Sequence, residues 1–430
     1  MIRQAIIAAR ETNERPDTAE IRGLAEAAEY RIVGEIDQRR REDPSYYFGR
    51  GKAEELAALA DRTEADAVVV DGELSPGQTA SLGELLPDGV EVVDRHRLVL
   101  GIFADRAGSR AARLQVELAQ LRYWKPRLEA IVGQDAAAEV RYHNENDRRV
   151  LDVERRIETL QRTLEDVSDA RSDRRERRRS EGFDHVALAG YTNAGKSTLL
   201  HRLADELSVD ERAPDHADLT ATASVEDQLF ETLETTTRRA TVGGRRALLT
   251  DTVGFVEGLP HDAVRSFETT LRTIRDADAT LLVVDACDPP DAVAEKVAVT
   301  LSTLGETSGP VVPVLNKVDA AADLSASREA LRDAASERGG AGRDPIPASA
   351  LTGEGVADLR AALRDALPTA ETAIEVPNCS GAQALLSWAY DSGRVSAVAY
   401  EGARLSFRFA ARPDVVEKAE RKAATVGERQ

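Results

Sequence analysis

The 430-residue chain contains few cysteines, few lysines, few aromatic side chains and no long apolar run. Its two cysteines, Cys287 and Cys379, lie far apart and match no metal-ligand spacing, so the pattern indicates reduced thiols rather than a zinc site or a disulfide framework. No apolar run approaches the roughly 20 residues of a membrane-spanning helix. We therefore expect a cytoplasmic protein with no membrane span.

The charge balance is strongly acidic, with 57 basic and 76 acidic residues and a formal net charge of -19. Lysine supplies only seven of the basic residues, and aromatic residues make up 4% of the chain. Abundant hydrated carboxylates with few lysines favour a halophilic cytoplasm over an ordinary acidic protein that avoids nucleic acid. Molar salt screens charges within a few ångströms, so under this interpretation the net charge says little about partners.

The predicted fold class is α/β, with four regions that differ in pattern. Alternating strand-like and helix-like runs over 1–104 predict a small α/β domain. Helical leucine spacing and a heptad repeat over 105–180 predict a long antiparallel helical hairpin. Longer apolar strands return over 181–368, and 369–430 form a small C-terminal α+β domain without recognisable chemistry. The hairpin positions are Leu114, Leu118, Leu121, Leu128, Val150, Val153, Ile157, Leu160 and Leu164.

A run of arginines ends the predicted hairpin, just before the third region. Such a run is usually a solvated helix face, but in a chain this acidic it is equally consistent with contact to phosphate or RNA. The two interpretations stay open. The run consists of Arg171, Arg174, Arg175, Arg177, Arg178 and Arg179.

A phosphate-binding loop follows the apolar strand-like segment 185–189 and precedes a helical segment that includes Thr198. A strand, a glycine-containing loop and a helix direct backbone N–H groups and the positive helix end at one point, where phosphate binds. Lys196 reaches the β and γ oxygens, and Ser197 holds a bridging Mg²⁺. The loop is Gly190, Tyr191, Thr192, Asn193, Ala194, Gly195, Lys196 and Ser197.

A second cluster, Asp251-Thr252-Val253-Gly254, follows the strand-like segment 247–250. A carboxylate at Asp251 suits an outer-sphere contact to Mg²⁺, and the Gly254 N–H can meet the γ-phosphate. Loss of that contact on hydrolysis would release the following loop and so provide a switch.

A third cluster predicts that the base is guanine. The Asp319 carboxylate can accept hydrogen bonds from guanine N1–H and N2–H₂, a donor pair that adenine lacks, so the cluster selects GTP over ATP. Lys317 would lie along the base plane and Asn316 would brace the loops. Ser349-Ala350 would supply a backbone N–H to guanine O6.

Switch I needs a threonine whose hydroxyl binds Mg²⁺. Thr236 is the candidate that we favour, with Thr235 and Thr237 as alternatives. The same segment could instead be a threonine-rich β edge without a role in metal binding. Ser197, Thr236 and Asp251 therefore form the predicted metal set.

Together these motifs resemble the HflX family of translational GTPases. The resemblance extends over nearly the whole chain and includes the Leu229–Arg238 switch segment, Tyr47–Lys52 and Leu114–Leu121. It implies a Ras-like P-loop GTPase domain between the hairpin and the C-terminal domain. It also implies binding to the large ribosomal subunit, through rRNA and ribosomal proteins, in rescue or splitting of stalled ribosomes or in control of translation under stress. Separately from the resemblance, we expect a monomer, although the sequence itself does not give the oligomeric state.

The chain departs from the family pattern at three places. The hairpin stretch 136–146 lacks the usual Gly-Glu-Thr-Gln, Glu234-Thr235 replaces the usual Asp-Pro, and 208–222 resemble an insertion. These departures concern the hairpin tip and the timing of the switch, not nucleotide binding.

Phe255 follows the Asp251–Gly254 cluster, where many GTPases have a glutamine that orients water. Because phenylalanine cannot orient water, we expect slow intrinsic hydrolysis with Lys196, Thr236, Gly254 and Asn193 as the catalytic set. Either a K⁺ beside Asn193 or the ribosome would complete the site.

Other function classes share some of these features. A nucleotide-gated binding module with negligible turnover would have the same motifs, whereas a tRNA-modification GTPase would need a folate or cysteine site. The loop Gly49–Lys52 is open to ATP binding, although a tight turn that starts a helix is the favoured interpretation.

Overall fold

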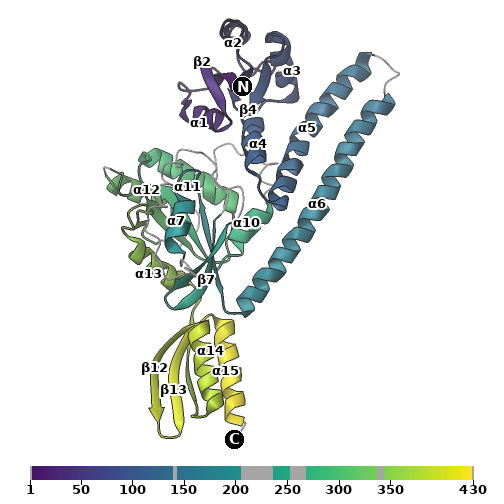
Figure 1. The fold of residues 1–430 in the computed structure, drawn as a ribbon. Coiled ribbons are helices and arrows are strands. Elements are labelled where there is room, and N and C mark those ends of the chain that lie inside the picture. The colour runs from purple at the N-terminus through teal and green to yellow at the C-terminus, as the bar shows by residue number, and fades with distance from the viewer. Residues whose placement is uncertain are drawn as a thin grey trace. The chain divides into compact units, whose positions relative to one another are not determined.

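The computed structural model describes residues 2–138, 143–204, 236–251, 268–321, 323–336 and 343–428. The chain divides into two compact units, of which the first contains Met1–Val167 and the second contains most of the chain from Ser168 onward. Figure 1 shows the helices and strands of both units. No helix among the described residues is both long enough and apolar enough to cross a bilayer.

The first unit begins with a parallel sheet in the order β2-β1-β3-β4. Ala5 to Ala9 of β1 are fully buried, as the apolar pattern predicts for a central parallel strand. The strands are β1 (Arg3–Glu11), β2 (Tyr30–Arg39), β3 (Ala67–Asp71) and β4 (Glu91–Asp94). The helices are α1 (Ala19–Ala27), α2 (Arg50–Thr63), α3 (Pro76–Leu85) and α4 (Arg95–Arg106).

Two long helices, α5 (Arg110–Ala138) and α6 (His143–Ser180), form an antiparallel hairpin (Figure 1). The residues of α6 up to Val167 belong to the first unit, and those from Ser168 onward belong to the second. Leu118 of α5 packs with Leu160 and Leu164 of α6, with three half-buried neighbours around them. Val150 and Val153, which the heptad pattern placed at the contact, are half-buried and lie outside this packed set. The three neighbours are Leu114, Leu121 and Ile157.

A buried arginine attaches α5 to the sheet of the first unit. The Arg127 guanidinium donates to Asp94 Oδ2 at 2.9 Å and to the Leu74 carbonyl at 2.7 Å. Its Cζ atom lies 3.5 Å from the centre of the Tyr123 ring. Asp94 also caps α4 through the Arg97 N–H, so one carboxylate fixes the start of α4 and the side of α5.

The second unit contains a sheet with the described order β10-β9-β8-β5-β7-β6, in which β6 alone is antiparallel to its neighbour. Its strands are β5 (Asp184–Gly190), β6 (Thr237–Val242), β7 (Arg245–Asp251), β8 (Ala279–Asp285), β9 (Val311–Asn316) and β10 (Ile346–Pro347). Its described helices are α7 (Lys196–Leu203), α10 (Glu268–Arg275), α11 (Pro290–Leu304), α12 (Ser325–Ser336) and α13 (Val356–Ala366).

The C-terminal part of the second unit is an antiparallel sheet, β11-β13-β12, with two helices against one face (Figure 1). Leu405, Phe407 and Phe409 alternate along β13 and are almost fully buried, the period-2 pattern of a strand with one covered face. The elements are β11 (Ala370–Pro377), α14 (Ser380–Ser392), β12 (Arg394–Glu401), β13 (Arg404–Ala411) and α15 (Pro413–Glu428). The predicted α+β character of this region is confirmed.

Five charged residues form an ionic cluster at the amino ends of β5 and β8. Arg245 donates to Asp184 Oδ1 at 2.5 Å, and Arg412 lies 3.7 Å from the same oxygen and hydrogen-bonds Asp278. Arg179, at the end of α6, donates to Asp278 Oδ1 at 3.2 Å. The cluster therefore joins α6, the six-stranded sheet and the C-terminal sheet, and Arg179 of the arginine run is a structural residue.

The cluster is shielded from solvent. The Asp184 side chain is fully buried and that of Asp278 is 7% exposed. Burial raises the pKa of Asp184 to about 7, while Arg245 and Arg412 limit the rise. Arg245 also donates to the Thr369 hydroxyl at 2.8 Å, which ties the cluster to the segment that leads into β11.

We expect Arg412→Met to destabilise the second unit by up to about 3–5 kcal/mol, because each of the two buried carboxylates loses one of its two arginine partners. A folded-state pKa raised above the unfolded value favours the protonated folded form, so stability falls as pH rises from about 4 through the folded pKa. The substitution should raise the pKa of Asp184 further. The loss of unfolding free energy relative to the wild type should therefore be larger at pH 8 than at pH 5. Urea unfolding at both pH values measures it.

The matched control is Arg408→Met, which removes an exposed arginine from β13, the strand that ends one residue before Arg412. Exposed pairs contribute about 0–1 kcal/mol, so this variant should unfold close to the wild type. Equal urea midpoints for the two variants would show that the cluster does not stabilise the unit.

Candidate nucleotide-binding site

The predicted phosphate-binding loop lies between β5 and α7, at the carboxyl edge of the parallel strands. Gly190 has φ 151°, and a Cβ there would lie 2.1 Å from the Val283 carbonyl oxygen. Gly195 has φ 82° and starts α7. Asn193 also adopts a left-handed conformation, with φ 64°. The glycines are therefore required both by the backbone turn and by the close approach of β8.

Lys196 is the first residue of α7 and is 6% exposed. Its ammonium donates to the Tyr191 carbonyl at 2.7 Å, so the side chain lies across the loop that precedes it. Burial lowers the pKa of Lys196 to about 8, and the nearby Asp251 carboxylate opposes this shift. The site thus contains a desolvated cation beside a loop of backbone N–H groups, which suits a polyanionic ligand.

Ser197 and Asp251 are 54 residues apart in sequence and in direct contact. Ser197 Oγ donates to Asp251 Oδ2 at 2.5 Å, and Asp251 is fully buried at the end of β7. Oxygen atoms of this kind are the ligands that Mg²⁺ prefers. Among the residues described, no three histidine, cysteine, aspartate or glutamate side chains converge on one point as a metal site.

Asn316 ends β9 and is 1% exposed. Its Nδ2 donates to the Ala194 carbonyl at 2.9 Å, and its Oδ1 accepts from the Ala350 N–H at 3.0 Å. One side chain therefore joins the phosphate-binding loop to the segment after β10, as the sequence predicts for a bracing residue.

The other candidate base-binding residues lie around Asn316. Lys317 has φ 64°, and its ammonium lies 2.8 Å from Asp285 Oδ2 at the end of β8. Asp319 is exposed and Ser349 is fully buried. Because the Ala350 N–H already donates to Asn316, a guanine O6 would share this donor.

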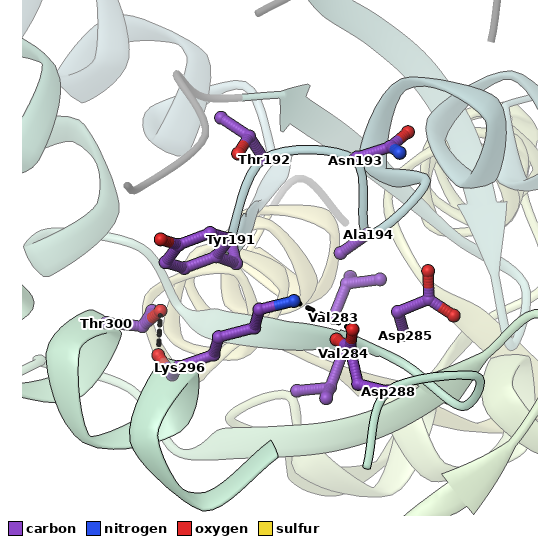
Figure 2. Close-up of a pocket in the computed structure, with 10 residues that line it drawn as sticks. All are labelled: Tyr191, Thr192, Asn193, Ala194, Val283, Val284, Asp285, Asp288, Lys296 and Thr300. Atoms are coloured by element: carbon purple, nitrogen blue, oxygen red, sulfur yellow. Dashed lines mark hydrogen bonds and ion pairs between the residues drawn. The ribbon is translucent and has the colours of Figure 1, made fainter. Parts of the chain in front are cut away.

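A cavity of about 80 Å³ lies between the phosphate-binding loop and α11 (Figure 2). The Lys296 ammonium donates to Asp288 Oδ1 at 2.8 Å and lies 5.1 Å from the centre of the Tyr191 ring. Asp285, Asp288 and Lys296 are not among the residues predicted from the sequence, although Asp285 and Asp288 are carboxylates at the end of an apolar strand, β8, which is a local signal. The lining is Tyr191, Thr192, Asn193, Ala194, Val283, Val284, Asp285, Asp288, Lys296 and Thr300.

The threonines of the predicted switch differ in their contacts. Thr236 precedes β6, and its carbonyl accepts from the Asp251 N–H at 2.9 Å. Thr237 is the first residue of β6, and its hydroxyl is 3.1 Å from the Thr250 hydroxyl. The Thr237 side chain is thus engaged within the sheet, whereas the backbone of Thr236 lies beside a predicted metal ligand.

Several predicted residues fall outside the described part of the chain. These are Thr235, Thr252, Val253, Gly254 and Phe255, together with the side chains of Arg171, Arg174, Arg175 and Arg177. Thr198 lies in the first turn of α7, and Arg178 is exposed near the end of α6.

Three family models match successive parts of the chain. The models described as GTP-binding GTPase N-terminal and GTP-binding GTPase Middle Region match residues 15–104 and 106–178. The model described as 50S ribosome-binding GTPase matches residues 185–317, from β5 to Lys317.

Solved structures are more distant. A GTP-binding protein from Sulfolobus solfataricus, solved in complex with GDP, is 22% identical over 84% of this chain and 98% of that chain. Its TM-score is 0.44, which is too low to support an inference.

Curated relatives match most of the chain. GTPase HflX of Thermococcus kodakarensis is 37% identical over 79% of this chain and 75% of its own length. GTPase HflX of Escherichia coli is 35% identical over 76% of this chain and 74% of its own length. With these matches and an α/β fold that contains a P-loop domain, the chain belongs to the HflX family of GTPases, which bind and hydrolyse GTP.

Proposed function

We propose that this GTPase acts on the large ribosomal subunit, in rescue or splitting of stalled ribosomes or in control of translation under stress. Support comes from the match of the GTPase region to a model described as 50S ribosome-binding GTPase. Nucleotide binding is supported by the buried Asn316 amide, which links the proposed phosphate end of the site to the proposed base end. The protein is proposed to be cytoplasmic and monomeric, with the four-domain division that the sequence predicts.

The proposed nucleotide site has separate ends for phosphate and base. The loop 190–197, with Thr198, binds the phosphates, and Lys196 places its charge between the β and γ groups. Asp319 accepts from guanine N1–H and N2–H₂, Lys317 lies along the base, and Ser349-Ala350 meets O6. Thr252, Val253 and Gly254 complete the γ-phosphate end.

The residues present fit a Mg²⁺ ion. Ser197 Oγ and the Asp251 carboxylate are 2.5 Å apart, and the Thr236 backbone hydrogen-bonds to Asp251. Ser197 and Thr236 would hold the ion directly, and Asp251 would hold it through water. When bound, Mg²⁺ would neutralise charge on the phosphate oxygens.

The Lys196 ammonium titrates near pH 8 in the free protein, since burial lowers its pKa. Bound phosphates favour the charged form, so binding takes up a proton above that pH and none below it. We expect the GDP dissociation constant to be flat below about pH 8 and to rise above it, by up to about tenfold per pH unit. Calorimetry between about pH 7 and pH 9 measures the profile, and Lys196→Met should be weaker and flat. A flat wild-type profile would contradict this role.

Ribosome dependence is the test of the proposed function. Phe255 cannot orient water, so the free protein should release phosphate slowly. Purified large subunits should raise GTP turnover several-fold or more, whereas small subunits at the same concentration should not. Equal turnover with both particles would reject the large subunit as the partner.

A K⁺ ion beside Asn193 is the alternative source of positive charge. Under this hypothesis, turnover by the free protein is faster in KCl than in NaCl at matched ionic strength, and Asn193→Ala removes the difference. Equal rates in the two salts would reject it, because screening alone does not distinguish K⁺ from Na⁺.

A further inference from the structure

Arg202 lies in the last turn of α7, the helix that begins at Lys196. Its Nε donates to the Ala350 carbonyl at 2.9 Å and its Nη2 donates to the Leu351 carbonyl at 2.5 Å. The two acceptors are consecutive carbonyls, so the planar guanidinium binds the loop in one orientation. The phosphate-binding helix is thereby connected directly to the segment 349–351.

The same segment is held from a second direction by Asn316, whose Oδ1 accepts from the Ala350 N–H. In a trans peptide the C=O and N–H groups point in opposite directions. With the Ala350 carbonyl directed at Arg202, the Leu351 N–H of that peptide is directed away from α7. Arg202 and Asn316 together therefore fix the directions of the Ala350 and Leu351 N–H groups, whereas the Ser349 N–H donates to the Glu354 carbonyl.

Bonds within the turn set its shape, and the Ala348 N–H, which donates to the Leu315 carbonyl at 2.9 Å, attaches its start to β9. Beyond Ala348, the position of the turn depends on the contacts to Asn316 and Arg202. The Thr352 N–H donates to Ser349 Oγ at 3.0 Å, and the Gly353 N–H donates to the Ser349 carbonyl at 2.9 Å. A turn closed only by its own hydrogen bonds can shift as a body. Because hydrogen bonds from N–H to O span only about 2.7–3.2 Å, a shift of an ångström would break a contact to a base oxygen.

We propose that Arg202 is a positioning residue for guanine recognition, which sets the distance between the 349–351 segment and guanine O6. This inference rests on the proposed assignment of that segment to O6. Arg202 acts through Ala350 and Leu351 and makes no contact with the base itself. By positioning this segment, Arg202 favours purines with an oxygen at C6 over purines with an amino group at C6.

The chain offers a matched control in Arg360 of α13. Its Nη2 donates to the Leu203 carbonyl at 2.9 Å and to the Arg202 carbonyl at 3.5 Å, and its Nη1 donates to the Thr241 carbonyl at 3.3 Å. Arg360 thus also binds backbone carbonyls at the end of α7, but these bonds go to α7 and β6. Arg360→Met should lower stability without changing the choice of base.

The experiment compares GDP with the diphosphate of 2,6-diaminopurine riboside, which keeps the 2-amino group, has an amino group in place of O6 and carries no hydrogen on N1. Because the N1 difference is the same for every variant, a change in preference on mutation reports on the C6 position. We expect Arg202→Met to weaken GDP binding and to reduce the preference for GDP over the analogue by about tenfold, the effect of losing a hydrogen bond to a fixed donor. Affinity for the analogue should change little. Calorimetry gives both constants, and thermal unfolding gives the stability of each variant.

Arg360→Met should keep the wild-type preference for GDP over the analogue, even if its unfolding temperature falls as much as that of Arg202→Met. If Arg202→Met fails to fold, Arg202→Lys serves instead, because a single ammonium cannot bind both carbonyls in the guanidinium geometry; its preference should lie below that of the wild type. A wild-type preference in the Arg202 variant, or an equal loss in Arg360→Met, would overturn the inference alone. A wild-type protein that binds both nucleotides equally would overturn the O6 assignment and the inference with it.

Discussion

Two hydrogen bonds made by one buried amide connect the ends of the nucleotide site, and the arrangement of the other site residues depends on them. Asn316 holds the Ala194 carbonyl on one side and the Ala350 N–H on the other. Loss of this side chain would leave two buried polar groups unpaired, at about 1–3 kcal/mol each. The amide also restricts the phosphate-binding loop, since a Cβ at Gly195 would lie 2.4 Å from Asn316 Nδ2. Asn316 can occupy this position only because residue 195, in the phosphate-binding loop, is a glycine.

The six-stranded sheet has the nucleotide site at its carboxyl edge and the ionic cluster at its amino edge. Asp184 and Gly190 are the two ends of β5, and all seven residues of that strand are buried. The cluster uses arginine throughout, and a guanidinium is less strongly hydrated than an ammonium and can bind two acceptors. Buried pairs are also screened less than exposed ones. In a chain whose composition favours high salt, this placement keeps the attractions that hold the second unit together out of reach of the solvent.

Much of the fold and of the site could be predicted because the signals are local. The glycine loop, the buried strands and the helix from Lys196 each follow from neighbouring residues, as does the α/β alternation of the first region. The contacts of individual side chains were harder to predict where tertiary packing determines them. Ile157, Leu160 and Leu164 of the predicted heptad lie at the hairpin contact, whereas Val150 and Val153 of the same heptad are half-buried and lie outside that packed set. Arg179 looked like part of a solvated or RNA-binding run, whereas it pairs with Asp278, 99 residues away.

By itself the sequence determined the order of motifs that marks a GTPase: a phosphate-binding loop, then the carboxylate for which we propose a metal role, and then the carboxylate for which we propose a guanine role. These depend on residue type and short spacing, which the chain displays directly. Only the tertiary structure decided which side chains support that chemistry. The bond of Arg202 to Ala350 spans 148 residues and that of Arg127 to Asp94 spans 33. An arginine that binds a distant carbonyl has the same local pattern as one that faces water, because its partner is set by how strands and helices pack.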